Sequence, residues 1–170
     1  MAAIEKETLI LNAQQLDQKI LRMAYEIYEH NVTRKDIVLA GISDNGYLLA
    51  NMINEHLKAI SPIKTTTVKV DINKEEPLKD EIKIPLEPKE LKNQSIIIID
   101  DVLNSGRTVA FVLKSFLDVR VNKIEVGIMI NRTHKAFPIY PKYVGYQLAT
   151  TINEHIDVKL KGKNKGVYLY

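Results

Sequence analysis

The sequence predicts an α/β fold in which a central, mostly parallel sheet carries helices on both faces and has a small antiparallel addition. Two observations lead to this fold class. Short apolar runs typical of buried strands alternate with longer amphipathic segments through the middle of the chain, as in successive strand-helix-strand units. Two strand-like segments then flank "KGKNKG" near the end, which predicts an antiparallel pair joined by a tight turn. The 170 residues suffice for one buried core, so we expect a single domain over residues 1–170.

The individual elements follow from the spacing of the apolar residues. Helical spacing, as at Leu16 and Ile20, predicts helices over 13–30, 47–60 and 107–119. Continuous apolar runs and alternating patterns predict strands over 37–42, 65–72, 95–99, 123–130 and 143–148, followed by "HIDVKL" and "VYLY". Residues 73–94 hold three prolines and many opposed charges, which predicts a mobile loop with at most a short strand near 82–84.

Composition excludes several classes of protein. The chain is 45% hydrophobic and 26% charged, as globular proteins are and disordered ones are not. Its 24 basic and 21 acidic residues give a net charge of +3, too small to indicate nucleic-acid binding by itself. There is no cysteine, which excludes disulfides and thiolate metal sites. The opening "MAAIEKETLILNAQQL" has no apolar run of signal length, so we expect a cytoplasmic protein without a membrane partner.

The stretch "IIIIDDVLNSGRTV" combines two chemically different halves. Asp100 and Asp101 follow four isoleucines, at the expected carboxyl end of a strand, where α/β sheets bind ligands. The small polar residues 104–108 then open a helix, whose unpaired N–H groups and dipole suit a phosphate. Carboxylates repel phosphate but suit neutral hydroxyls or a divalent cation. A sugar phosphate with vicinal hydroxyls satisfies both halves, although each half alone is also common in proteins that bind nothing there.

The joint pattern D-D-V-L-x-S-G-x-T resembles the diphosphoribosyl-binding signature of the type I phosphoribosyltransferases. The likeness covers most of the chain, because "IVLAGISDNGYLLANMI", "NRTHKAFPIYPKYVG" and the closing hairpin follow in matching order. Within the family, the chain most resembles the subfamily of pyrimidine operon attenuation regulators that are also uracil phosphoribosyltransferases. The resemblance implies a type I phosphoribosyltransferase-like fold. It also implies transfer from 5-phosphoribosyl 1-diphosphate to a nitrogenous base, uracil-like or purine, giving a nucleoside 5'-monophosphate and diphosphate.

The resemblance further implies a role for each candidate residue. Asp100 and Asp101 become the catalytic pair, facing the ribose 2- and 3-hydroxyls. The 5-phosphate is expected at Asn104, Ser105, Gly106, Arg107 and Thr108, and the diphosphate at a loop of Ser43, Asp44, Asn45 and Gly46. The flexible loop over 73–83 would supply Lys74 and Lys79, and the base region Arg132 and Tyr146. Mg²⁺ is the expected cofactor, entering with the substrate and not through direct protein ligands.

Three departures from the subfamily leave two functions open. The diphosphate loop lacks a basic residue and holds Asp44, which repels diphosphate. The loop over 73–83 is short and acidic, without the expected Tyr-Arg pairing, and Tyr146 and Gln147 stand where "GKN" is typical. The first function is therefore a phosphoribosyltransferase; the alternative is a non-catalytic regulator that senses ribose phosphates or nucleotides and could bind RNA. The lysine run 159–166 is typical of a solvated hairpin tip, with RNA contact as the lesser reading. We expect a homodimer or a larger homo-oligomer.

Overall fold

The structure, a computed structural model, describes residues 7–170. Its helices are α1 (Ala13–Asn31), α2 (Ser43–Ile60), α3 (Pro88–Leu91) and α4 (Arg107–Leu117). Its strands are β1 (Thr8–Asn12), β2 (Asp36–Ile42), β3 (Lys64–Val70), β4 (Ser95–Leu103), β5 (Lys123–Arg132), β6 (Tyr143–Leu148), β7 (Ile156–Lys159) and β8 (Gly166–Leu169). A parallel sheet has the order β3-β2-β4-β5-β6, and a small antiparallel sheet has the order β1-β8-β7. The predicted fold class is thereby confirmed.

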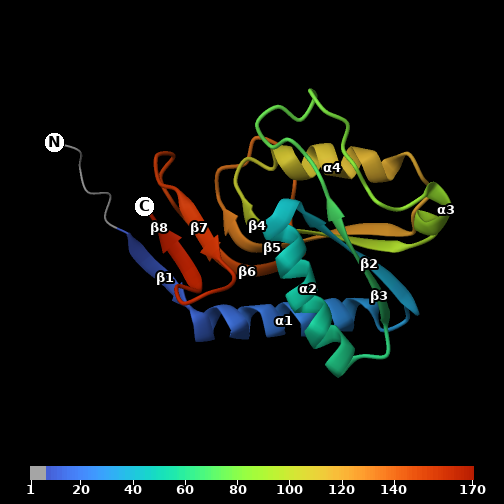
Figure 1. Cartoon of the computed structure of the whole chain (residues 1–170), viewed down its shortest axis with the longest axis horizontal. Coiled ribbons are helices and arrows are strands. Elements are labelled where there is room, and N and C mark those ends of the chain that lie inside the picture. The colour runs from blue at the N-terminus through green and yellow to red at the C-terminus, as the bar shows by residue number, and fades with distance from the viewer. Residues whose placement is uncertain (1–6) are drawn as a thin grey trace.

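Helices cover both faces of the parallel sheet (Figure 1): α1 and α2 lie on one face and α4 on the other. The side chains of β4 alternate between these two layers. Ile97 and Ile99 belong to the core with α1 and α2, whereas Ile96 and Ile98 pack with α4. All four are fully buried. The central strand is thus covered on both faces, as its unbroken apolar run predicts.

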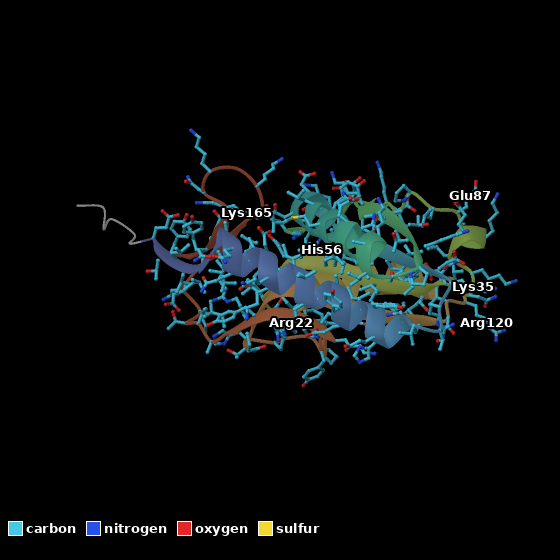
Figure 2. The ribbon with its side chains drawn as sticks, turned by 90° about the horizontal axis from the view of Figure 1, so that it is seen from below. Arg22, Lys35, His56, Glu87, Arg120 and Lys165 are labelled. Carbon is cyan, nitrogen blue, oxygen red and sulfur yellow. The ribbon has the colours of Figure 1, made fainter. Side chains whose placement is uncertain are left out.

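The two ends of the parallel sheet carry different structures. Figure 2 shows Lys35 and Arg120, which precede β2 and β5, at the amino-terminal end, and Lys165 of the β7–β8 loop at the other end. The small sheet stands beside the carboxyl ends of the strands, where β7 contacts β4. Among the helices of residues 7–170, none combines the length and apolar character that crossing a membrane requires.

The structure corrects several predicted boundaries. α2 begins at Ser43 and not at residue 47, so "SDNG" forms its first turn and is not a loop. β4 runs through the acid pair to Leu103, where we predicted its end at residue 99. The strand β1, which we did not predict, pairs with β8 and leads straight into α1, whose N-terminus is capped by the Asn12 side chain.

The connection between β3 and β4 also differs from the prediction. No regular strand forms near 82–84; an isolated bridge joins Asp71 to Lys83 instead. The short helix α3 follows, with Pro88 in its first turn, a position that proline favours. The connection rises from the carboxyl end of β3 and arches above α4 (Figure 1), which brings residues from this loop near the acid pair.

Candidate active site

Asp100 and Asp101 lie on β4 and point to opposite faces of the sheet, as consecutive strand residues do. The Asp100 side chain is only 2% exposed, and the Lys74 ammonium approaches its two carboxylate oxygens at 3.2 and 3.3 Å. Asp101 is half-buried, and its Oδ2 accepts a hydrogen bond of 2.8 Å from Asn45 Nδ2. The acid pair is therefore held from two sides, by the long loop and by the start of α2.

Burial dominates the electrostatics of Asp100. Desolvation raises the pKa of its carboxyl to about 8, although the charge of Lys74 acts in the opposite direction and Asp101 adds to the increase. One lysine that is itself 40% exposed does not compensate for taking a carboxylate out of water. A pKa raised in this way by burial beside a charged partner is common at functional sites, and structural clusters also shift pKa values.

Residues 104–108, which we call the cradle, follow the acid pair and lead into α4. α4 begins at Arg107 after Gly106, which has φ of 86° and offers no side-chain cap, while the Arg107 backbone N–H donates to Ser105 Oγ at 3.3 Å. A Cβ on Gly106 would lie 3.2 Å from the Ile139 side chain, so both backbone angle and space favour glycine. The carbonyl of Ser105 accepts hydrogen bonds from two backbone N–H groups of the 136–137 segment, which fixes the turn. The geometry suits an anion at the helix start.

A cavity of about 320 Å³ joins the cradle to Asp100. Its lining contains all five residues predicted for the 5-phosphate, together with Lys74: Asn104, Ser105, Gly106, Arg107 and Thr108. The predicted phosphate residues are thus brought together around one space, beside one of the two predicted acids.

A second cavity of about 240 Å³ lies on the other side of the acid pair. It shares Lys74, Val102 and Asn104 with the first and adds Asp101 and the segment 155–158 of the small sheet. Sequence reasoning placed that segment in a closing hairpin but did not assign it to the site. Only the packing of β7 against β4, far apart in the chain, brings it there.

Arg132, the last residue of β5, is buried in a hydrogen-bond network that joins Asn104 to the 150–154 segment. Its Nη1 donates to Asn104 Oδ1 at 2.8 Å and its Nε donates to Thr150 Oγ1 at 2.7 Å, while Nη2 donates to the carbonyls of Thr151 and Glu154. With a residue exposure of 8%, the guanidinium directs four of its five N–H donors to protein acceptors. It positions Asn104 against the 150–154 segment, and the base contact that we predicted for it stays a prediction.

The other predicted base residue, Tyr146, lies away from both cavities. It packs on the core beside α1, and the Lys19 ammonium sits 5.6 Å from its ring centre. The lining of neither cavity includes it. The two loop lysines also separate: Lys74 reaches Asp100, whereas Lys79 pairs with Glu76 inside the loop at 2.8 Å.

The predicted diphosphate residues form the first turn of α2. Ser43 has φ of 54°, a strained value for a residue with a Cβ. Gly46 packs against β4 so closely that a Cβ would lie 2.6 Å from the Ile99 carbonyl oxygen. Asn45 contacts Asp101, and Asp44 forms a 2.7 Å ion pair with Lys69 of β3. The turn thus touches the acid pair directly, through the hydrogen bond from Asn45 to Asp101.

Similarity to known proteins places the chain in a family. Residues 8–163 match the family model described as phosphoribosyl transferase domain. The chain belongs to this family. Proteins named "Bifunctional protein PyrR" from Halalkalibacterium halodurans and Clostridium beijerinckii are each 35% identical to it, over 89% and 91% of both chains respectively. The crystal structure of a hypoxanthine-guanine phosphoribosyltransferase from Bacillus anthracis matches with a TM-score of 0.78 at 18% identity, covering 98% of each chain.

These similarities confirm the expected family, including its likeness to the attenuation-regulator subfamily, and the type I phosphoribosyltransferase-like fold. The expectation of a phosphoribosyltransferase is confirmed at this level of the family. Within residues 7–170, no group of three or more His, Asp or Glu side chains is placed to hold a metal ion. Two carboxylates, one of them paired with lysine, fit a magnesium ion only if the substrate supplies most of its oxygen ligands.

Proposed function

We propose that this protein transfers the 5-phosphoribosyl group of 5-phosphoribosyl 1-diphosphate to a nitrogenous base, uracil-like or purine, releasing diphosphate and a nucleoside 5'-monophosphate. The observation that carries the proposal is the position of Asp100 and Asp101 between an anion-binding helix start and a second cavity. The relatives named bifunctional PyrR and the hypoxanthine-guanine phosphoribosyltransferase fold support the same class of reaction.

The substrate's phosphate and sugar fit the first cavity. The 5-phosphate accepts hydrogen bonds from the backbone N–H groups of residues 105–108 and from the side chains of Ser105 and Thr108. The ribose then lies over the acid pair, with its hydroxyls donating to the carboxylates. Lys74 must leave Asp100 at this point, because its ammonium already occupies both carboxylate oxygens. Sugar binding and movement of the 73–83 loop are therefore coupled.

The base fits the second cavity, beside residues 155–158 of β7 and its preceding loop. This cavity meets the first at Lys74, Val102 and Asn104, which places a base there next to the sugar. The polar groups His155 and Asp157 are available to select among bases, in place of the predicted Tyr146. Asn45 donates to the Val158 carbonyl as well as to Asp101, and it therefore ties the β7 side of the second cavity to the acid pair.

The reaction breaks the bond from the sugar C1 to diphosphate and forms a bond from C1 to a base nitrogen, which loses its proton to solvent. Positive charge builds on the sugar ring in between. Asp100 and Asp101, fixed by a strand buried on both faces, stabilise that charge without reorganising. Mg²⁺, bound with the substrate, would neutralise the departing diphosphate. The protein's contribution is thus orientation, together with the negative charge that the acid pair carries once Asp100 has lost its proton.

Diphosphate release tests the proposal. Purified protein, Mg²⁺ and 5-phosphoribosyl 1-diphosphate are incubated with uracil, hypoxanthine, guanine or adenine, and diphosphate is measured. We expect base-dependent release with at least one of them. Replacing both acids by asparagine should remove release and weaken ribose 5-phosphate binding. Unchanged binding of ribose 5-phosphate by that double variant would contradict the site assignment.

A non-catalytic regulator is the second candidate, favoured by two features. Asp44 places a carboxylate in the turn that should receive diphosphate, and Lys74 occupies Asp100. Thermal stabilisation by ribose 5-phosphate or a nucleotide, without release of diphosphate with any base, would support it against the enzyme. RNA binding and a homo-oligomer remain part of the proposal, and gel-shift titration and sedimentation velocity test them.

A further inference from the structure

Lys69 is a basic residue on the edge strand β3, beside the first turn of α2, and the sequence analysis did not assign it a role. It lies near the carboxyl end of β3, where it pairs in register with Gly41 of β2. Its ammonium contacts Asp44 Oδ1 at 2.7 Å and Asp71 Oδ1 at 3.3 Å, and its side chain is 37% exposed. A cation on this strand end faces the same turn of α2 that was expected to hold diphosphate and to lack positive charge.

The first turn of α2 connects Lys69 to the acid pair. Asn45 donates to Asp101, while the adjacent Asp44 holds Lys69. The sheet register gives the same relation, because Gly41 pairs with Lys69 on one side and with Ile99, the residue before Asp100, on the other. Two strand spacings, about 10 Å, therefore separate the backbone of Lys69 from that of the acid pair. A long lysine side chain bridges much of that distance toward a group leaving the sugar.

We propose that Lys69 binds the diphosphate of the substrate, replacing the basic residue missing from the turn at 43–46, and that Asp44 holds Lys69 in place when the site is empty. This inference rests on the proposed function and names the residue that recognises its leaving group.

The chemistry of the ammonium group supports both parts of the proposal, namely that Lys69 binds diphosphate and that Asp44 holds Lys69 when the site is empty. An ammonium has three donors, so Lys69 can keep Asp71 while it exchanges Asp44 for a diphosphate oxygen. Asp44 is 95% exposed and moves into water at little cost when it is displaced. Its pKa is lowered by the hydrogen bond and charge of Lys69 and, more weakly, by the charge of Lys161 from the β7–β8 loop. A second lysine therefore also faces this turn.

If Lys69 exchanges Asp44 for diphosphate, removing either charge changes the affinity for diphosphate, which would not happen with a purely structural ion pair. Because Asp44 competes with diphosphate for one cation, removing its charge strengthens diphosphate binding, whereas removing Lys69 weakens it. If the pair only stabilised the fold, neither change would alter diphosphate affinity.

Isothermal titration with magnesium diphosphate, and separately with ribose 5-phosphate, measures this difference in the full chain. We expect Lys69→Met to weaken diphosphate binding about 10-fold and to leave ribose 5-phosphate binding within about twofold. Asp44→Asn should tighten diphosphate binding about threefold. Lys69→Arg should restore most of the loss, and Lys64→Met, which removes an exposed lysine at the far end of the same strand, serves as the matched control and should change neither ligand.

The outcomes distinguish a failure of the role proposed for Lys69 from a failure of the proposed function. Wild-type diphosphate affinity in Lys69→Met, or weaker binding in Asp44→Asn, would overturn the role of Lys69 while ribose 5-phosphate binding still supports the site. Wild-type protein that binds diphosphate but not ribose 5-phosphate would overturn the proposed function, and the same two variants would still decide whether Lys69 is the diphosphate cation.

Discussion

Two buried carboxylates on neighbouring strands have opposite electrostatics. Asp100 lies toward the carboxyl end of β4 with 2% exposure, and Glu125 lies toward the amino end of β5 with 8% exposure. Burial opposes the charge of both. At Glu125, hydrogen bonds from Lys142, Tyr143 and Lys123 outweigh it and hold the pKa at about 2. At Asp100, burial prevails and the pKa is about 8.

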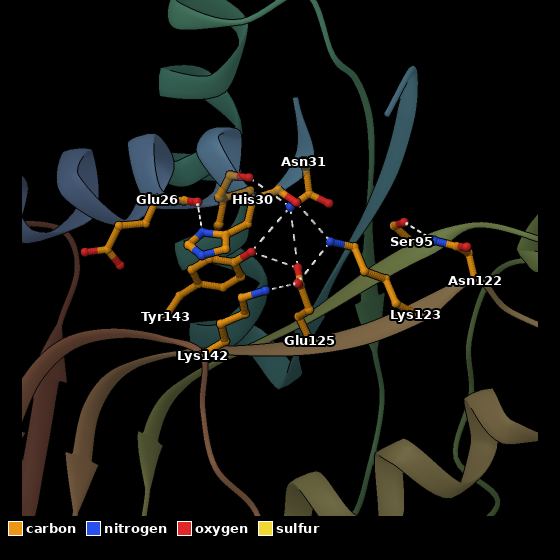
Figure 3. Close-up of polar contacts among 10 residues, drawn as sticks. Glu26, His30, Asn31, Ser95, Asn122, Lys123, Glu125, Lys142 and Tyr143 are labelled. Carbon is orange, nitrogen blue, oxygen red and sulfur yellow. Dashed lines mark hydrogen bonds and ion pairs between the residues drawn. The ribbon is translucent and has the colours of Figure 1, made fainter. Parts of the chain in front are cut away.

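The difference lies in how many donors surround each carboxylate. Figure 3 shows Glu125 between Lys142 at 2.6 Å, the Tyr143 hydroxyl at 2.7 Å and Lys123 at 3.0 Å. Tyr143 is fully buried beneath His30, whose ring meets it edge to face, and Asn31 donates to the tyrosine hydroxyl. This cluster ties the end of α1 to β5 and β6. Asp100 accepts instead from Lys74 and from the Asp101 backbone N–H, which leaves other lone pairs of its carboxylate for a ligand.

The comparison makes Glu125 the more important of the two for stability. Glu125→Ala should lower the free energy of unfolding by about 3 kcal/mol, because it leaves a buried hydroxyl and two lysines without their acceptor. Urea unfolding at neutral pH measures the change. Glu55→Ala, which removes an exposed partner of Lys58, is the control and should change stability by less than about 0.5 kcal/mol. Equal effects of the two variants would contradict the role of the Glu125 cluster.

Asp100 should show the reverse, with activity lost and stability gained. Asp100→Asn should reduce the rate of diphosphate release about 100-fold, since half of the field under the sugar disappears. The same variant should be about 1–2 kcal/mol more stable than wild type near pH 9, because it no longer buries a charge at alkaline pH. Unfolding and kinetics on one preparation test both; a destabilised variant at that pH would refute the burial argument.

The pH dependence of stability should likewise have opposite signs at the two sites. Asp100 has a folded pKa of about 8, above the ordinary aspartate value of 3.8, so its contribution is full below 3.8 and is lost as pH rises from there through about 8. Glu125 has a folded pKa of about 2, below 4.5, so its contribution is present above 4.5 and is lost as pH falls through about 2. Asp100→Asn should therefore remove a decline of the denaturant midpoint between about pH 4 and pH 8, and Glu125→Gln should remove a decline below about pH 4.5.

The smallest expected effect concerns the single partner of Asp100. Lys74→Met should raise the pKa of Asp100 further, since the lysine charge is the main factor that lowers it. Carboxyl ¹³C chemical shifts measure that titration. Stability should change by less than about 1 kcal/mol, because Lys74 is 40% exposed. Lys79→Met is the matched loop control, and an identical Asp100 titration in both variants would show that Lys74 does not face this acid in solution.

Local pattern was enough to predict the centre of the molecule. The isoleucine run, the acid pair and the small residues before α4 act through their own neighbours in the chain, so the strand and the start of α4 follow directly. The first turn of α2 was missed because Ser, Asp, Asn and Gly are typical of loops. Its helical start depends on Gly46 packing against Ile99, a tertiary contact.

Residues that act across the sheet could not be predicted in the same way. Lys69 and the 155–158 segment reach the site only through strand pairing and the placement of the small sheet. The hydrogen bonds of Arg132 to Thr150 and Asn104 join residues 18 and 28 positions away, which no local pattern reveals. The strand β1 was missed because its partner, β8, lies at the other end of the chain.

The contact between Lys74 and Asp100 also suggests a route to inhibitors. The protein has placed an ammonium group against the carboxylate that is expected to face the sugar ring. A compound that carries a protonated ring nitrogen in place of the sugar, together with a phosphate for the cradle, would present the same positive charge without needing the loop. Such an iminosugar phosphate would compete with the protein's own lysine, and its affinity would rise in Lys74→Met.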